Sequence, residues 1–83
     1  MYKVRLTAKA KKQLKKLSIQ ERFSLGEIIE NIKDNPLVGK SLGRELTGKY
    51  SYRIGAYRVI YQLNSKDKVI IILEADHRER IYN

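Results

Sequence analysis

The spacing of hydrophobic and polar residues changes twice along the chain, from a short alternating start to helical spacing and back to alternation. Residues 2–7 alternate between apolar and basic side chains, and this period of two predicts a β-strand. Over residues 8–17 the apolar positions recur at helical spacing between lysines, at Ala10, Leu14 and Leu17. Thr7 is a good N-cap residue, so we expect a helix to begin directly after it.

A second helix is predicted by its start and stop signals. Ser18 and Glu21 form an S-x-x-E capping box. An apolar stripe follows at Leu25, Ile28, Ile29 and Ile32, with Ile19 and Phe23 nearer the start. Asn35-Pro36 ends the helix, because proline disfavours helical geometry in the residue before it. The link between the two helices is very short, so we expect an antiparallel αα-hairpin.

From Lys49 onward the period returns to two. Residues 49–54 and 57–63 alternate, and Gly55-Ala56 between them predicts a two-residue hairpin turn with glycine at the position of positive φ. A second turn is predicted at residues 64–67. Residues 68–75 contain a continuous apolar run, which is typical of a strand buried on both faces.

These elements predict one domain, residues 1–83, of the α+β class with the order β-α-α-β-β-β. We expect the helical hairpin to pack on one face of a twisted, mainly antiparallel sheet of about four strands. Residues 37–48 are expected to form a loop or an irregular strand start. The first strand is expected at the sheet edge beside the strand that begins at Lys49. The predicted core consists of Val4, Leu6, Leu14, Leu17, Ile28, Ile29, Ile32, Val59, Tyr61, Ile70 and Ile72.

The chain is strongly basic. Its 83 residues include 18 Lys and Arg against 9 Asp and Glu, and residues 1–17 carry seven basic side chains and no acidic one. This charge favours a polyanion or an acidic protein as partner, although a solubilising surface charge is the plainer interpretation. The lack of Cys excludes disulfides, thiolate zinc sites and cysteine nucleophiles. With a single His we expect no metal site and no cofactor. No apolar run approaches 18 residues, and the start does not resemble a signal peptide, so we expect a cytoplasmic protein.

The register of the predicted hairpin supplies the first indication of chemistry. If Gly55-Ala56 is the turn, Arg53 and Arg58 lie directly opposite each other, on the face away from the helices. Two like charges in this position destabilise a sheet. Paired guanidiniums short of a counter-ion suit a phosphate, because two N–H donors can point at two oxygens together. Two arginines that simply extend into water, or a slipped register, remain open alternatives.

The residues after the last strand add further candidates. Because a histidine side chain can donate or accept a proton, His77 is a candidate for proton transfer. Tyr82 is a candidate for stacking on an exposed base. Arg78 and Arg80 add positive charge beside them. A solvated histidine and a tyrosine that anchors the tail are the plainer interpretations. The alternating strand tyrosines likewise fit the core as well as RNA stacking.

Two stretches resemble the RelE/ParE superfamily of toxins. They are Gly55-x-Tyr57-Arg58-x-x-Tyr61 and the terminal His77-Arg-Glu-Arg-Ile-Tyr82. The basic helical hairpin, the Asn35-Pro36 stop and the Gly-Lys-Tyr start of the strand at Lys49 are also similar. The resemblance covers essentially the whole chain. It implies the toxin of a type II toxin–antitoxin pair, with a RelB-like acidic antitoxin as partner.

In the RelE branch, the resemblance implies a metal-independent endoribonuclease that cuts mRNA on the ribosome and so inhibits translation. The ribose 2′-hydroxyl attacks the adjacent phosphate, while basic side chains move protons and stabilise the added phosphoryl charge. By position in the motifs, Arg53 matches a basic residue of the family's strand, and Arg58 would hold the scissile phosphate. Arg78 would serve the leaving oxygen, and Tyr82 would orient the base or the substrate. His77 is then the candidate base. Further RNA contacts are expected from Lys49, Ser51 and Arg80.

One departure from the RelE pattern keeps other functions open. Many RelE-like chains carry a basic residue where this chain has Ser51, and Lys49 on the same face is a possible substitute. The alternative functions are a ParE-like inhibitor of DNA gyrase without nuclease activity, and an inert member that binds antitoxin or RNA only.

Overall fold

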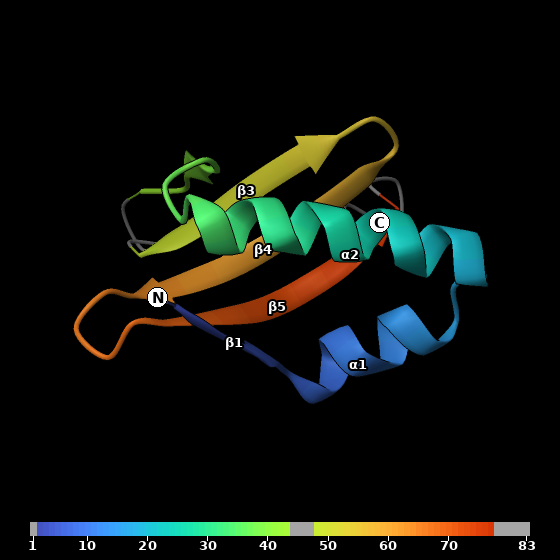
Figure 1. Ribbon diagram of the computed structural model, residues 1–83, viewed down its shortest axis with the longest axis horizontal. Helices are drawn as coiled ribbons and strands as arrows, with labels where there is room; N and C mark the ends of the chain where they lie inside the picture. The colour runs from blue at the N-terminus through green and yellow to red at the C-terminus, as the bar shows by residue number, and fades with distance from the viewer. Residues whose placement is uncertain (1, 44–47, 78–83) are drawn as a thin grey trace.

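The computed structural model describes residues 2–43 and 48–77, which form two helices on one face of a five-stranded sheet (Figure 1). The elements in chain order are β1 (Lys3–Leu6), α1 (Ala8–Lys15), α2 (Ile19–Asp34), β2 (Lys40–Ser41), β3 (Lys49–Ile54), β4 (Tyr57–Asn64) and β5 (Val69–His77). The strand order in the sheet is β1-β5-β4-β3-β2. Strand β1 runs parallel to β5, and every other pairing is antiparallel. The predicted α+β class and element order are confirmed.

The first strand lies at an edge of the sheet as predicted, but its predicted neighbour is wrong. Strand β1 lies at the far edge of the sheet from β3 and pairs with β5, which sets Val4 beside Ile70 and Leu6 beside Ile72. This pairing adds two apolar side chains of β1 to the layer that β5 already buries, which is why the most apolar strand is the better neighbour. The edge of β3 is instead occupied by the two-residue strand β2, from the segment expected to be a loop or an irregular strand start. The sheet therefore has five strands rather than four.

Both predicted helix caps are present. The Thr7 hydroxyl accepts a hydrogen bond from the Ala10 N–H at 3.1 Å. Ser18 and Glu21 exchange two side-chain-to-backbone bonds, each 3.1 Å long, so the capping box is complete. Helix α2 ends at Asp34, directly before Asn35-Pro36. No helix in the described part of the chain is long and apolar enough to cross a membrane.

The capping box predicts a stability change that can be measured directly. Ser18→Ala removes the side chain that satisfies the Glu21 N–H, and we expect the free energy of unfolding to fall by about 1 kcal/mol. Ser24→Ala is the matched control, because the Ser24 hydroxyl only donates to the Gln20 carbonyl within the helix. Urea denaturation of the three proteins tests this. Equal midpoints for both variants would contradict a stabilising cap.

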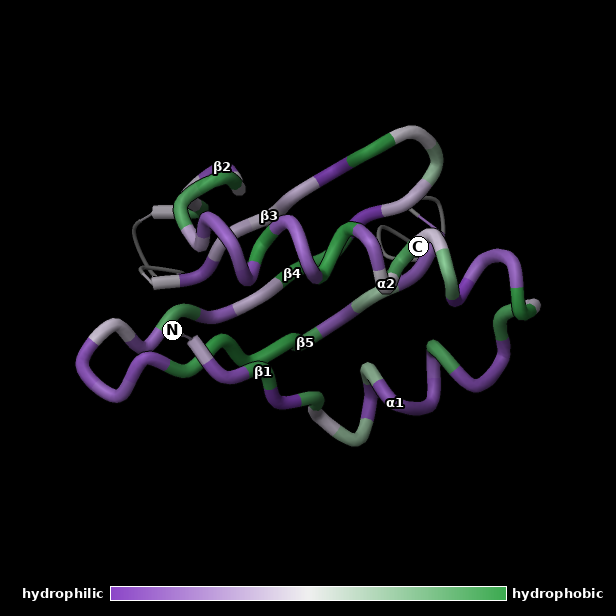
Figure 2. Tube along the Cα trace, viewed as in Figure 1, coloured by the Kyte–Doolittle hydropathy of each residue, from purple (hydrophilic) through white to green (hydrophobic). Residues whose placement is uncertain are grey.

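The core lies between the helices and one face of the sheet. Its buried apolar residues are Ala10, Leu17, Leu25, Ile28, Ile32, Val59, Tyr61, Ile70, Ile72 and Ala75. Seven of these were predicted, and the other four predicted residues, Val4, Leu6, Leu14 and Ile29, are partly buried against the cluster. In Figure 2 the stretch of β5 beside β1 is hydrophobic, while α1 is mostly hydrophilic. The expectation that β5 is buried on both faces is wrong, since Ile71 and Leu73 are only half-buried.

Tyr61 ties the segment after α2 to the sheet. Its ring is fully buried, and its hydroxyl donates to the Pro36 carbonyl at 2.6 Å and accepts from the Gly39 N–H at 3.1 Å. A Cβ at Gly39 would lie 2.7 Å from that hydroxyl oxygen, so the close approach requires glycine. Burial raises the pKa of Tyr61 above its usual 10.0, and the hydrogen bond from Gly39 partly opposes this. Strand β2 begins directly after this anchor and is thereby held beside β3.

Candidate functional site

The face of the sheet opposite the core is rich in basic side chains. Val59, Tyr61, Ile70 and Ile72 point toward the helices, so strand alternation places their neighbours on the other face. With the strand registers, this open face carries Lys3, Arg5, Lys40, Lys49, Arg53 and Arg58. Two acidic residues of β5, Glu74 and Asp76, lie opposite β4 on the same face. Glu74 pairs with Lys9 of α1 at 3.1 Å.

The predicted pairing of the two arginines is confirmed. Arg53 lies opposite Arg58 in the β3–β4 register, and Ile54 lies opposite Tyr57. Gly55 opens the turn between them with a φ of 59°, as a primed hairpin turn requires. Directly opposed residues of antiparallel strands have Cα atoms about 4.5–5.5 Å apart. The hairpin therefore places the two arginine residues side by side on the open face.

The arginines line a hollow of about 520 Å³ at the end of the sheet where β2 meets β3. Arg58 donates from Nη1 to the Ser51 hydroxyl at 3.1 Å, which draws its guanidinium toward β3. Lys40 also lines the hollow, because its strand register places it opposite Ser51. The sequence analysis missed Lys40, since it gave residues 37–48 only as a loop or an irregular strand start. The one sequence feature that points to Lys40 is its position directly after Gly39, the glycine that packs against Tyr61.

Asp76 is the second residue that the sequence reading missed. Strand β5 continues to His77, two residues beyond its predicted end at Ala75, and Asp76 therefore enters the ladder directly opposite Arg58. Asp76 is only 7% exposed. The register therefore brings an acidic residue next to Arg58 in the ladder, which the sequence analysis did not predict. Within residues 2–43 and 48–77, Arg53 forms no ion pair, so the hollow still presents excess positive charge.

The structure does not bring His77 together with the arginines. Its backbone pairs with Tyr57, and alternation places its ring on the opposite face from Asp76 and Arg58. The ring meets Tyr57 edge-on with centroids 5.8 Å apart. Among the other predicted residues, Lys49 and Ser51 lie on the open face of β3. Arg78, Arg80 and Tyr82 lie outside the described residues.

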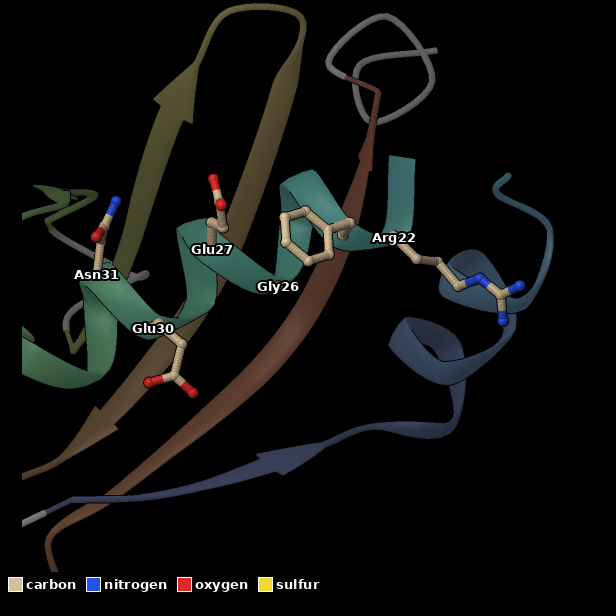
Figure 3. A pocket seen from close by; sticks show the side chains of 6 residues that line it. Arg22, Gly26, Glu27, Glu30 and Asn31 are labelled. Atoms are coloured by element: carbon tan, nitrogen blue, oxygen red, sulfur yellow. The ribbon is translucent and has the colours of Figure 1, made fainter. Parts of the chain in front are cut away.

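A second hollow, of about 640 Å³, lies on the outer surface of α2 and has a different character. Figure 3 shows its charged side chains diverging, with Arg22 pointing away from Glu27 and Glu30. Phe23 beside them is 70% exposed. Because these polar groups do not converge on one point, this surface lacks the geometry of a catalytic site. No group of three or more metal-binding side chains occurs in the described ranges.

A family comparison identifies the chain. Residues 4–82 match the family model described as the ParE toxin of the type II toxin–antitoxin system parDE. The chain belongs to the ParE toxin family. Toxin RelG of Mycobacterium tuberculosis is 38% identical over 87 residues, which cover 98% of this chain and 95% of RelG. The predicted membership of the RelE/ParE superfamily is confirmed, and the protein is the toxin of a type II toxin–antitoxin system.

Solved structures of related toxins share the fold. The toxin–antitoxin complex RelBE2 of M. tuberculosis contains a chain that is 38% identical, with a TM-score of 0.83 over 93% of this chain and 98% of that one. The archaeal RelE–RelB complex of Pyrococcus horikoshii contains one that is 31% identical, with a TM-score of 0.73 over 95% and 97%. The isolated Escherichia coli RelE toxin is 18% identical and shares the fold with a TM-score of 0.79 over 99% and 97%.

Proposed function

We propose that this toxin is a ribosome-dependent endoribonuclease of the RelE branch that cuts mRNA without a metal ion. The observation that carries the proposal is the pair Arg53 and Arg58, opposed across the hairpin and joined by Lys40 in one hollow. Three cations around one hollow suit the phosphate of a polynucleotide. The relatives at 38% and 31% identity carry RelE-type names, which supports this branch.

The proposed reaction is an attack of the ribose 2′-oxygen on the adjacent phosphorus. The new P–O bond closes a 2′,3′-cyclic phosphate while the bond to the 5′-oxygen breaks, and the proton lost by the 2′-hydroxyl is balanced by one gained at the leaving oxygen. Negative charge builds on the phosphoryl oxygens in the transition state. Arg58, already oriented by Ser51, donates to those oxygens, and Arg53 adds a second cation. Preorganised donors of this kind contribute most where the charge develops.

The remaining residues have supporting roles in this proposal. Lys49 and Ser51, which lie within β3 on the open face, would contact the RNA backbone beside the cleaved bond, and Arg80 would add a further contact. Arg78 would serve the leaving oxygen and Tyr82 would orient a base, as the family resemblance implies. We assign no proton-transfer step to His77, because its ring packs against Tyr57 on the other face.

The partner and the place of action follow from the same proposal. An acidic, RelB-like antitoxin would cover the basic open face and α1 and so block access to the hollow. The lysines of α1 are the second positive surface, at Lys9, Lys11, Lys12 and Lys15. The toxin would act in the cytoplasm, where ribosomes and mRNA meet.

A translation-coupled cleavage assay tests the function. Purified toxin is added to a reconstituted translation reaction programmed with one mRNA, and to the same mRNA without ribosomes. We expect cuts within the translated region in the first reaction and little or no cutting in the second. For the metal test, ribosomes are first stalled on the mRNA, and EDTA is then added while the free magnesium concentration is kept equal to that of the untreated sample. Cleavage should persist in the EDTA-treated sample. Absence of cleavage by the wild-type toxin would exclude the proposal.

Inhibition of DNA gyrase is the second candidate function. It is favoured by the ParE description of the matching family model and by Ser51, which stands where many RelE-like chains have a basic residue. A supercoiling assay run beside the cleavage assay separates the two. Loss of supercoiling without mRNA cleavage would assign the toxin to gyrase.

A further inference from the structure

We propose that Val38 and Leu42 form a base-binding wall, on which a nucleotide base packs while the neighbouring phosphate lies on the arginine pair. The inference rests on the proposed nuclease function and names the part of the RNA that the hollow holds beside the phosphate. Both residues line the same hollow of about 520 Å³ as Arg53 and Arg58. Pockets for small ligands commonly enclose about 300–1,000 Å³, so this hollow has room for a base as well as a phosphate.

The segment around β2 places these two apolar residues on either side of Lys40. Lys40 lies opposite Ser51 in the β2–β3 register, on the open face. Leu42 follows on the same face two residues later, because side chains alternate along an extended chain. Its backbone N–H donates to the Lys49 carbonyl at 2.9 Å, which continues the pairing with β3. Val38 lines the hollow from the turn before β2. One hollow therefore combines cations with apolar surface.

The core does not account for the base-binding wall. Val38 is 37% exposed and Leu42 is half-buried. Among the described residues, neither belongs to the buried core or to the apolar residues that pack against it. Apolar surface beside cations suits a ligand that carries a flat apolar face next to a negative charge, and a nucleotide has both. Its base packs on aromatic and apolar side chains, while its phosphate meets Lys and Arg.

The wall is held in place before a ligand arrives. The Val38 N–H donates to the Asn35 carbonyl at 2.9 Å, which closes a turn with Pro36 at its second position. The next residue, Gly39, donates from its N–H to the Tyr61 hydroxyl at 3.1 Å. The backbone of Val38 is thus fixed on both sides. A preorganised surface loses little conformational freedom on binding, which favours affinity.

The affinities of the toxin for two short single strands test the wall. Both strands have a 2′-O-methyl backbone, which attack of the 2′-oxygen cannot cut, and one of them lacks every base. We expect the wild type to bind the base-bearing strand more tightly. Val38→Ser should lower that affinity about fivefold and leave the affinity for the abasic strand unchanged, because it removes apolar contact and no charge. Leu37→Ser is the matched control, since Leu37 is 67% exposed and does not line the hollow. It should bind both strands like the wild type.

Lys40→Ala separates the phosphate contact from the base contact. It should weaken binding of both strands alike and lower the slope of log affinity against log salt concentration by roughly one, as expected for one lost phosphate contact. None of these measurements uses ribosomes or cleavage. If the wild type does not cut mRNA during translation, the proposed function fails, and the affinities of Val38→Ser still decide whether the wall binds a base.

Three outcomes would overturn the inference. The first is equal affinity of the wild type for the two strands. The second is the same affinity for the base-bearing strand in Val38→Ser and Leu37→Ser. The third is a change from dimer to monomer in Val38→Ser on gel filtration with RNA affinity unchanged, because the wall would then contact a second copy. Should Val38→Ser unfold in thermal denaturation, Val38→Thr keeps the branched shape and should lower affinity for the base-bearing strand alone, about twofold; no change there would equally overturn the inference.

Discussion

Arg58→Ala is expected to lower the rate of ribosome-dependent mRNA cleavage by about 10²–10³-fold, the usual cost of removing a preorganised donor to a developing oxyanion. Arg58 is the one arginine of the pair whose guanidinium is bonded within the hollow, to Ser51, and it stands opposite both Arg53 and Asp76. Arg58→Lys keeps the charge and loses the two-pronged geometry, so we expect an intermediate rate. Single-turnover cleavage on programmed ribosomes measures these rates.

Arg5→Ala is the matched control for this loss. Arg5 is exposed on the same face of the sheet, on β1, and its removal changes the net charge equally. We expect its cleavage rate to stay within about threefold of wild type, since a surface charge outside the site acts mainly through screened attraction. Full activity of Arg58→Ala, or equal losses in both variants, would show that this guanidinium does not bind the scissile phosphate.

Tyr61→Ala is expected to produce the largest loss of stability, about 3–5 kcal/mol. The variant opens a cavity in the centre of the core, where the Tyr61 ring is fully buried and stacks on Tyr50 with centroids 5.4 Å apart. It also removes the partner of the Pro36 carbonyl and the Gly39 N–H. Since small domains are stable by only about 5–15 kcal/mol, this loss leaves a marginal fold. Equilibrium denaturation in urea measures the change.

Tyr61→Phe separates the hydroxyl from the ring. It leaves the Gly39 N–H and the Pro36 carbonyl short of a partner, and we expect a loss of about 1–3 kcal/mol. Tyr57→Phe is its control, because no hydrogen bond of the Tyr57 hydroxyl occurs among residues 2–43 and 48–77. The same loss in both Phe variants would mean that the anchor to the segment after α2 contributes nothing.

The raised pKa of Tyr61 predicts one further trend for this residue. The buried phenol keeps its proton above pH 10.0, where tyrosines in the unfolded chain ionise. The contribution of Tyr61 to stability is therefore complete below that pH and declines as the pH rises toward the folded-state pKa. Tyr61→Phe should reduce this decline at alkaline pH.

Local sequence signals predicted correctly the structural features that depend on residues close together in the chain. The caps at Thr7 and Ser18, the stop at Asn35-Pro36 and the turn at Gly55 all act within a few residues, and each appears as predicted. The Arg53–Arg58 pair belongs to this group, because a two-residue turn sets the register of the whole hairpin.

Contacts between segments far apart in the chain could not be predicted from these local signals. The partner of β1, the pairing of β2 with β3, and the extension of β5 to Asp76 depend on which strand edges are free once the core has formed. Strand pairing is not encoded by the period of a segment, since every alternating strand offers the same hydrogen bonds to any edge. The sequence thus determines the arginine pair, whereas the assembled sheet decides that Lys40 and Asp76 lie beside it.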